Sequence, residues 1–95
     1  MNAYFERNGV VTTKYRFMNK EELRQVLRKE AIREDAFDLD GGHLSETYTL
    51  SESYGRWFVY YSEKGVESGK KEFASQAQAC EYLLNVLRND PTARI

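Results

Sequence analysis

Side chains able to do acid–base, nucleophilic or metal chemistry are scarce in this sequence, which has one histidine, His43, and one cysteine, Cys80. His43 stands three residues after Asp40, and such a pair would suit a general base or a metal ligand. A zinc site of ordinary composition needs further cysteine or histidine ligands, and none is near. Because His43 follows a Gly-Gly pair in a predicted loop, an ordinary loop position or a contact with a partner is the favoured interpretation.

Cys80 would act as a nucleophile only if a neighbouring base activated it. It shares one face of a predicted helix with Leu83, Leu84 and Leu87. A buried free cysteine behaves as a small hydrophobic residue, so we expect Cys80 to lie in the core. A single cysteine also excludes a disulfide within the chain and implies no oxidising compartment.

The glycine pair Gly41-Gly42 does not belong to a phosphate-binding loop, because neither G-x-x-x-x-G-K nor G-x-G-x-x-G occurs in the sequence. The acidic residues before it also lack the spacing of a calcium-binding EF-hand loop. We therefore predict no catalytic residues, no cofactor and no metal site, and expect that the protein is not an enzyme.

The acidic residues are concentrated in 32–52, where one arginine stands against six carboxylates and the formal charge is therefore −5. The whole chain has a net charge of −1, which argues against a general nucleic-acid binder. In a strand, Asp38 and Asp40 would point to the same face and form an acidic patch. Three interpretations stay open for this patch: a solvated face, a surface that contacts a partner, and a site for a hard cation.

Hydrophobic periodicity predicts two amphipathic helices and four strands. The helices are predicted over 19–31 and 75–89, and the strands over 36–42, where a short strand runs into a turn, 46–51, 56–62 and 66–73. Asn19 and Ser75 are good N-cap residues, and each is followed three residues later by Glu or Gln. The strand over 56–62 is apolar or aromatic on both faces, which is typical of a central strand.

These elements predict one domain over residues 1–95 with an α+β fold. Short links between neighbouring strands favour antiparallel pairing, and two amphipathic helices need a sheet face to cover. We therefore expect an antiparallel sheet of about four strands packed against two helices. An additional N-terminal hairpin over 3–17 is indicated by Asn8-Gly9, the dipeptide of a type I′ turn.

Five segments, in their order along the chain, resemble a family of small bacterial proteins. They are D-A-F-D-L-D-G-G (35–42), E-T-Y-T-L (46–50), R-W-F-V-Y-Y-S-E-K-G (56–65), F-A-S-Q-A-Q-A-C-E-Y-L-L (73–84) and D-P-T (90–92). Together they are similar to immunity proteins of polymorphic toxin systems, including contact-dependent growth inhibition. The predicted N-terminal hairpin is not part of this resemblance.

The resemblance implies a cytoplasmic protein that binds one cognate toxin C-terminal domain, a nuclease or an NAD-cleaving enzyme, and covers its active site. An acidic surface can occupy the basic cleft of a nuclease and steer its association. The predicted contacts are acidic residues, the histidine and an aromatic residue in a turn: Glu34, Asp35, Asp38, Asp40, His43, Glu46, Glu52 and Tyr54. The absence of a long apolar segment and of a signal peptide also favours the cytoplasm over a membrane.

Two other functions stay open. The aromatic run between Trp57 and Tyr61 could stack RNA bases, as some RNA-binding sheets do, although the acidic stretch would repel phosphate. A small enzyme acting through His43 or Cys80 is the remaining alternative. The strand over 66–73 is predicted to have an exposed edge that could pair with a partner or a second copy, so we expect a monomer or a weak dimer.

Overall fold

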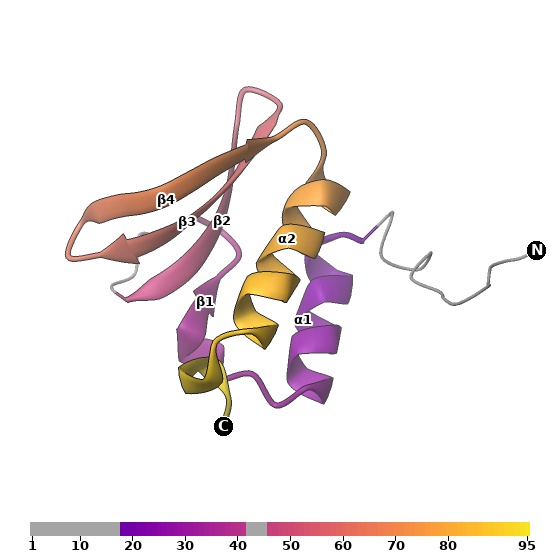
Figure 1. The fold of residues 1–95 in the computed structure, drawn as a ribbon. Coiled ribbons are helices and arrows are strands. Elements are labelled where there is room, and N and C mark those ends of the chain that lie inside the picture. The colour runs from indigo at the N-terminus through magenta and orange to yellow at the C-terminus, as the bar shows by residue number, and fades with distance from the viewer. Residues whose placement is uncertain (1–17, 42–45) are drawn as a thin grey trace, which may run out of the picture.

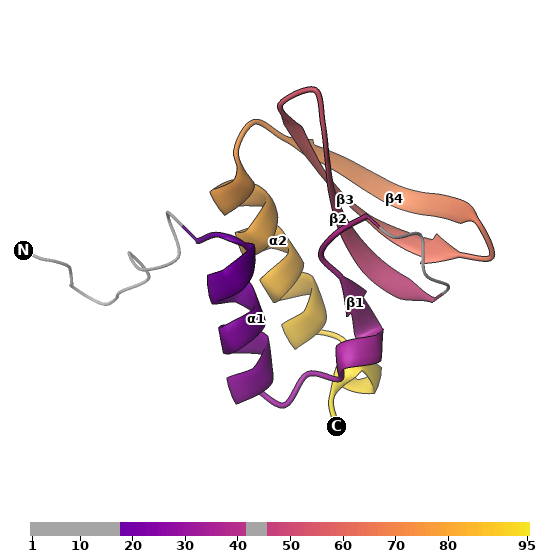
Figure 2. The same ribbon diagram turned by 180° about the vertical axis from the view of Figure 1, so that it is seen from behind.

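The computed structural model describes residues 18–41 and 46–95, which form a helical layer and a sheet (Figure 1). The helices are α1 (Lys20–Lys29) and α2 (Gln76–Arg88), and the strands are β1 (Phe37–Asp38), β2 (Thr47–Ser53), β3 (Arg56–Glu63) and β4 (Val66–Phe73). Short 3-10 turns, Glu34–Ala36 and Pro91–Ala93, precede β1 and follow α2. Both helices lie on the same side of the sheet (Figures 1 and 2).

The predicted α+β class, with four strands and two helices, is confirmed. The second helix begins and ends within one residue of its predicted bounds, while the strand predicted over 36–42 has only two residues. The predicted hairpin over 3–17 and the side chain of His43 lie outside the described residues.

The sheet has the order β1-β2-β3-β4, and its two hairpins are antiparallel as predicted. The pairing of β1 with β2 is parallel, with Phe37 beside Tyr48, so the expectation of antiparallel pairing throughout was wrong. Parallel pairing usually needs a long crossover. Because β1 has two residues and is only about 7 Å long, the eight residues between β1 and β2 are enough to return the chain.

The helices begin where their N-cap residues predict. At α1, Asn19 Oδ1 accepts from the backbone N–H of Glu22 at 2.9 Å, and Glu22 Oε1 accepts from the backbone N–H of Asn19 at 3.1 Å. At α2, Ser75 Oγ accepts from the backbone N–H of Gln78 at 3.2 Å. These bonds satisfy backbone donors that have no partner within the helix, which fixes both helix starts.

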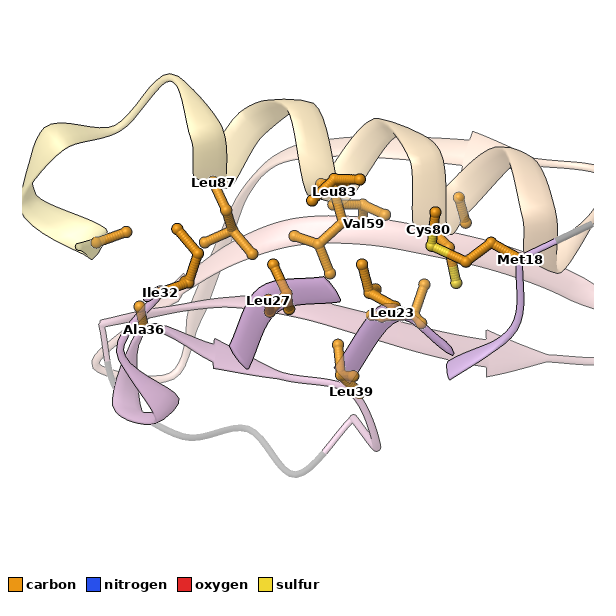
Figure 3. Packing of buried hydrophobic residues seen from close by; sticks show 14 residues of the cluster. Met18, Leu23, Leu27, Ile32, Ala36, Leu39, Val59, Cys80, Leu83 and Leu87 are labelled. Carbon is orange, nitrogen blue, oxygen red and sulfur yellow. The ribbon is translucent and has the colours of Figure 1, made fainter. Parts of the chain in front are cut away.

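The core lies between the helices and the sheet (Figure 3). Its buried side chains come from every layer: Met18, Leu23, Leu27, Ile32, Ala36, Leu39, Leu50, Val59, Ala79, Cys80, Leu83, Leu84, Leu87 and Ala93. Leu50 pairs with Val59 across β2 and β3, so this pair marks the face of the sheet that the helices cover. The alternate residues of these strands therefore point to the opposite face.

The C-terminal ends of the two helices are joined by an ion pair between Glu30 and Arg88. Arg88 Nε donates to Glu30 Oε1 at 2.8 Å and Nη2 donates to Oε2 at 2.5 Å, and the two side chains are 33% and 25% exposed, arginine first. Two-point guanidinium–carboxylate pairs of this kind are stronger than ordinary surface pairs.

Replacing Glu30 by glutamine is expected to lower the free energy of unfolding by about 1 kcal/mol, because the guanidinium loses its charged partner while remaining half-buried. Urea unfolding of the two proteins measures the difference. Glu52→Gln, at an exposed carboxylate of β2, is the matched control and should change the free energy by less than about 0.3 kcal/mol. Equal effects of the two substitutions would contradict this role for the pair.

Candidate functional site

Two of the predicted acidic contacts are already neutralised within the protein. Asp40 accepts from Lys20 Nζ at 3.1 Å and from Arg24 Nη2 at 3.0 Å, and the hydrogen bond from Lys20 is the main cause that holds the pKa of Asp40 below its ordinary value. Asp35 pairs with Arg33 at 2.5 Å. A partner that used these carboxylates would have to displace arginine or lysine side chains of the protein itself.

Asp38 and Asp40 do not share one strand face. Asp38 is the last residue of β1, and its Oδ1 accepts from the backbone N–H of Asp40 at 2.9 Å. This local bond turns the chain out of the strand and directs Asp40 to α1. The prediction of one acidic strand face was therefore wrong.

The remaining predicted carboxylates, Glu34, Glu46 and Glu52, are exposed and form no ion pair within the described part of the chain. They lie in three different places. Glu34 begins the 3-10 turn before β1, Glu46 is the residue before β2, and Glu52 is the second-last residue of β2. They are thus free to attract a basic partner over long range, although they do not form one continuous patch.

A hollow of about 270 Å³ lies between α1 and the segment around β1. It brings together three of the predicted carboxylates with two arginines and an apolar floor: Glu34, Asp38, Asp40, Arg24, Arg28, Ile32, Phe37, Leu39 and Ile95. Because positive and negative groups line it together, this hollow is not an acidic site.

Tyr54 is the predicted contact that the structure presents most openly. Tyr54 and Gly55 form the turn between β2 and β3, with φ of 51° and 80°, as a type I′ turn requires. The tyrosine side chain is fully exposed, at 102% of its reference area. This turn forms the projecting end of the hairpin (Figure 1), so Tyr54 is accessible from several directions.

The sequence prediction missed a set of half-buried aromatic residues beside α2. The sequence places Tyr61 in a strand that is apolar or aromatic on both faces, which is typical of a central strand. In the structure Tyr48, Tyr61, Phe73 and Tyr82 are only partly buried and line hollows next to α2. Alternation along the strands places Tyr48, Tyr61 and Phe73 on the helical side of the sheet, and Tyr82 belongs to α2 itself. Alternation does not reveal which part of that side the helices leave uncovered.

Cys80 lies in the core as predicted, with no measurable exposure. Burial raises the pKa of its thiol to about 11. A thiol with that pKa is almost entirely protonated at neutral pH and is a poor nucleophile.

The Cys80 thiol is expected to react with a disulfide reagent at pH 8 at least about 100-fold more slowly in the folded protein than in concentrated urea. With a pKa of about 11, only about 0.1% of the thiol is ionised at pH 8, against about a quarter of an ordinary cysteine. Absorbance of the released reagent anion measures both rates. Similar rates in the folded and unfolded protein would contradict the burial of this side chain.

The described residues show neither a metal site nor a membrane-spanning helix. These residues contain no cluster of three or more His, Cys, Asp or Glu side chains suited to a metal ion. None of the described helices combines the length and apolar character that a membrane crossing requires. Comparisons with protein-family models, with curated proteins and with solved structures give no match to this chain.

Proposed function

We propose that this protein is a cytoplasmic immunity protein, which binds one cognate toxin domain and neutralises it by covering the active site. The proposal is supported by the ordered segments over residues 35–92 that resemble this family, and by an α+β fold that presents side chains suited to binding another protein. The observation that carries it is the position of Tyr54.

Tyr54 contributes little to the fold. Its backbone lies in the left-handed region, at φ 51°, which is unfavourable by about 1 kcal/mol for an aromatic residue. Its ring is fully exposed and therefore gains nothing from burial. An aromatic residue of this kind, held on a rigid hairpin, is well suited to fill a pocket on a partner, because tyrosine is among the residues that dominate binding energy at interfaces.

Free carboxylates support the same function. Glu52 is exposed two residues before Tyr54, and Glu34 and Glu46 are exposed elsewhere. A nuclease toxin has a basic cleft for phosphate, and acidic side chains would increase its rate of association with the inhibitor. We assign the anchoring role to Tyr54 and the steering role to Glu34, Glu46 and Glu52, because Asp35 and Asp40 are already paired.

The RNA-binding alternative is weakened by the face of the sheet opposite the helices. Phe58 and Tyr60 point to that face, and Lys70 Nζ lies 4.9 Å and 5.5 Å from their ring centroids. Tyr60 is only 3% exposed. Tyr60 is therefore not open for stacking with bases, and a base that stacked on the partly exposed Phe58 would have to displace Lys70.

Purification of the tagged protein from its native host at high salt tests the proposal. We expect one stoichiometric protein partner, because a tight interface survives salt that removes weak charge contacts. The matched variant Tyr54→Ala should recover much less of this partner at the same expression level. Recovery of RNA, or of no partner above background, would contradict the proposal.

A further inference from the structure

A groove runs between α2 and the strands β3 and β4. It consists of two neighbouring hollows of about 170 and 400 Å³, which share the side chain of Tyr82. We call it the tyrosine groove, because its aromatic wall is formed by Tyr48, Tyr61, Phe73 and Tyr82. All four side chains are partly exposed, so parts of their rings are accessible to a ligand.

The aromatic side chains of the tyrosine groove hold one another in place. Tyr48 and Tyr61 meet edge to face with centroids 5.0 Å apart, and Phe73 and Tyr82 lie 5.2 Å apart. The hydroxyl of Tyr48 also donates to Asp90 Oδ2 at 3.0 Å. The rings are therefore preorganised, which lowers the entropy lost when a ligand binds against them.

Carboxylates surround the tyrosine groove. Glu63 follows Tyr61 by two residues on β3 and therefore projects from the same face of the sheet. Burial, and then the negative charges of Glu46, Glu63 and Asp90, raise the pKa of Tyr61. Glu81 lines the other end of the groove. Two positive groups oppose these carboxylates: Lys71, beside Val59 on β4, and Arg33, whose charge lowers the pKa of Asp90. The four carboxylates Glu46, Glu63, Glu81 and Asp90 outnumber them.

We propose that the tyrosine groove binds the cationic end of an arginine or lysine side chain supplied by a partner protein. A guanidinium or ammonium group is attracted to the faces of tyrosine rings, and Glu46, Glu63 and Glu81 complement its charge. The alkyl part of the same side chain would pack against Val86, which also lines the groove. A phosphate or a carboxylate would be repelled.

This site goes beyond the proposed function, because it selects a basic side chain whichever protein supplies it. Its Tyr48–Tyr61 end is remote from Tyr54, since Tyr61 is five residues along β3 from the first residue, Arg56, whereas Phe73 at its other end pairs with Trp57. A partner that occupied both places would contact the helical side of the sheet as well as the hairpin tip.

Nuclear magnetic resonance titration with a capped hexa-arginine peptide tests the site on the full chain. We expect saturable shifts of the Tyr61 and Tyr82 ring protons and of the Val86 methyl groups. Tyr82→Leu should raise the dissociation constant by about tenfold, while Tyr82→Phe, which keeps the ring, should bind within about twofold of the original protein. Phe58→Leu, on the opposite face of the sheet, is the matched control outside the groove and should not change binding.

Three outcomes would overturn the inference. They are shifts spread over the whole surface, equal binding of the Tyr82→Leu variant, and equal binding of a hexa-glutamate peptide. None of these outcomes depends on a toxin, so failure of the groove and failure of the immunity function are distinguishable. A hydrogen–nitrogen correlation spectrum of each variant shows whether it is folded.

Discussion

Replacement of Leu27 by alanine is expected to lower the free energy of unfolding by about 3 kcal/mol, which is a large part of the stability of a domain of this size. Leu27 lies on α1 and is completely buried. In Figure 3 its side chain lies in the cluster with Val59 of the sheet and Leu87 of α2. The substitution would leave a cavity where the layers meet.

Equilibrium unfolding in urea measures this loss, and Gln25→Ala provides the matched control. Gln25 is exposed on the same helix, and alanine has a good helix propensity, so this variant should stay within about 0.5 kcal/mol of the original protein. A loss below about 1 kcal/mol for Leu27→Ala would mean that α1 is not an essential part of the core.

Replacement of Tyr54 by asparagine should have opposite effects on stability and binding. The free energy of unfolding should rise by about 0.5 kcal/mol, because asparagine tolerates the left-handed backbone better than an aromatic residue. The dissociation constant for the protein partner should rise by about 30-fold, which corresponds to the loss of about 2 kcal/mol from an interface anchor. Urea unfolding and calorimetric titration measure the two quantities.

The second hairpin supplies the control for this experiment. Lys64 and Gly65, between β3 and β4, have φ of 50° and 81° and so repeat the backbone of the first turn. Lys64→Asn makes the same change at the equivalent turn position and should leave partner binding unchanged. If Tyr54→Asn bound as well as Lys64→Asn, the hairpin tip would not be the anchor.

Local patterns were sufficient to predict most of the fold. The capping residues Asn19 and Ser75 predict where the helices begin, and side-chain alternation predicts β2 and β3. The parallel partner of β2 was not predicted, because a strand of two residues has no periodicity of its own. Its position depends on packing of Ala36 and Leu39 in the core, which is a tertiary effect.

The candidate site was less predictable, because the effect of a charge depends on what lies next to it. Asp40 looks like a free surface carboxylate in the sequence, yet its partners Lys20 and Arg24 are 20 and 16 residues away. In the same way, Tyr61 looks like a core residue, and only the placement of α2 leaves it partly exposed. Tyr54 was predicted as a contact because a turn residue is exposed whatever the tertiary arrangement.

Growth of bacteria that express the co-purified partner protein, with and without this chain, tests the immunity function most directly. We expect that the partner alone stops growth, that the original protein and Lys64→Asn restore it, and that Tyr54→Asn restores it poorly at equal expression. If the partner killed cells regardless of this protein, with both present in soluble form, the proposed immunity function would be contradicted.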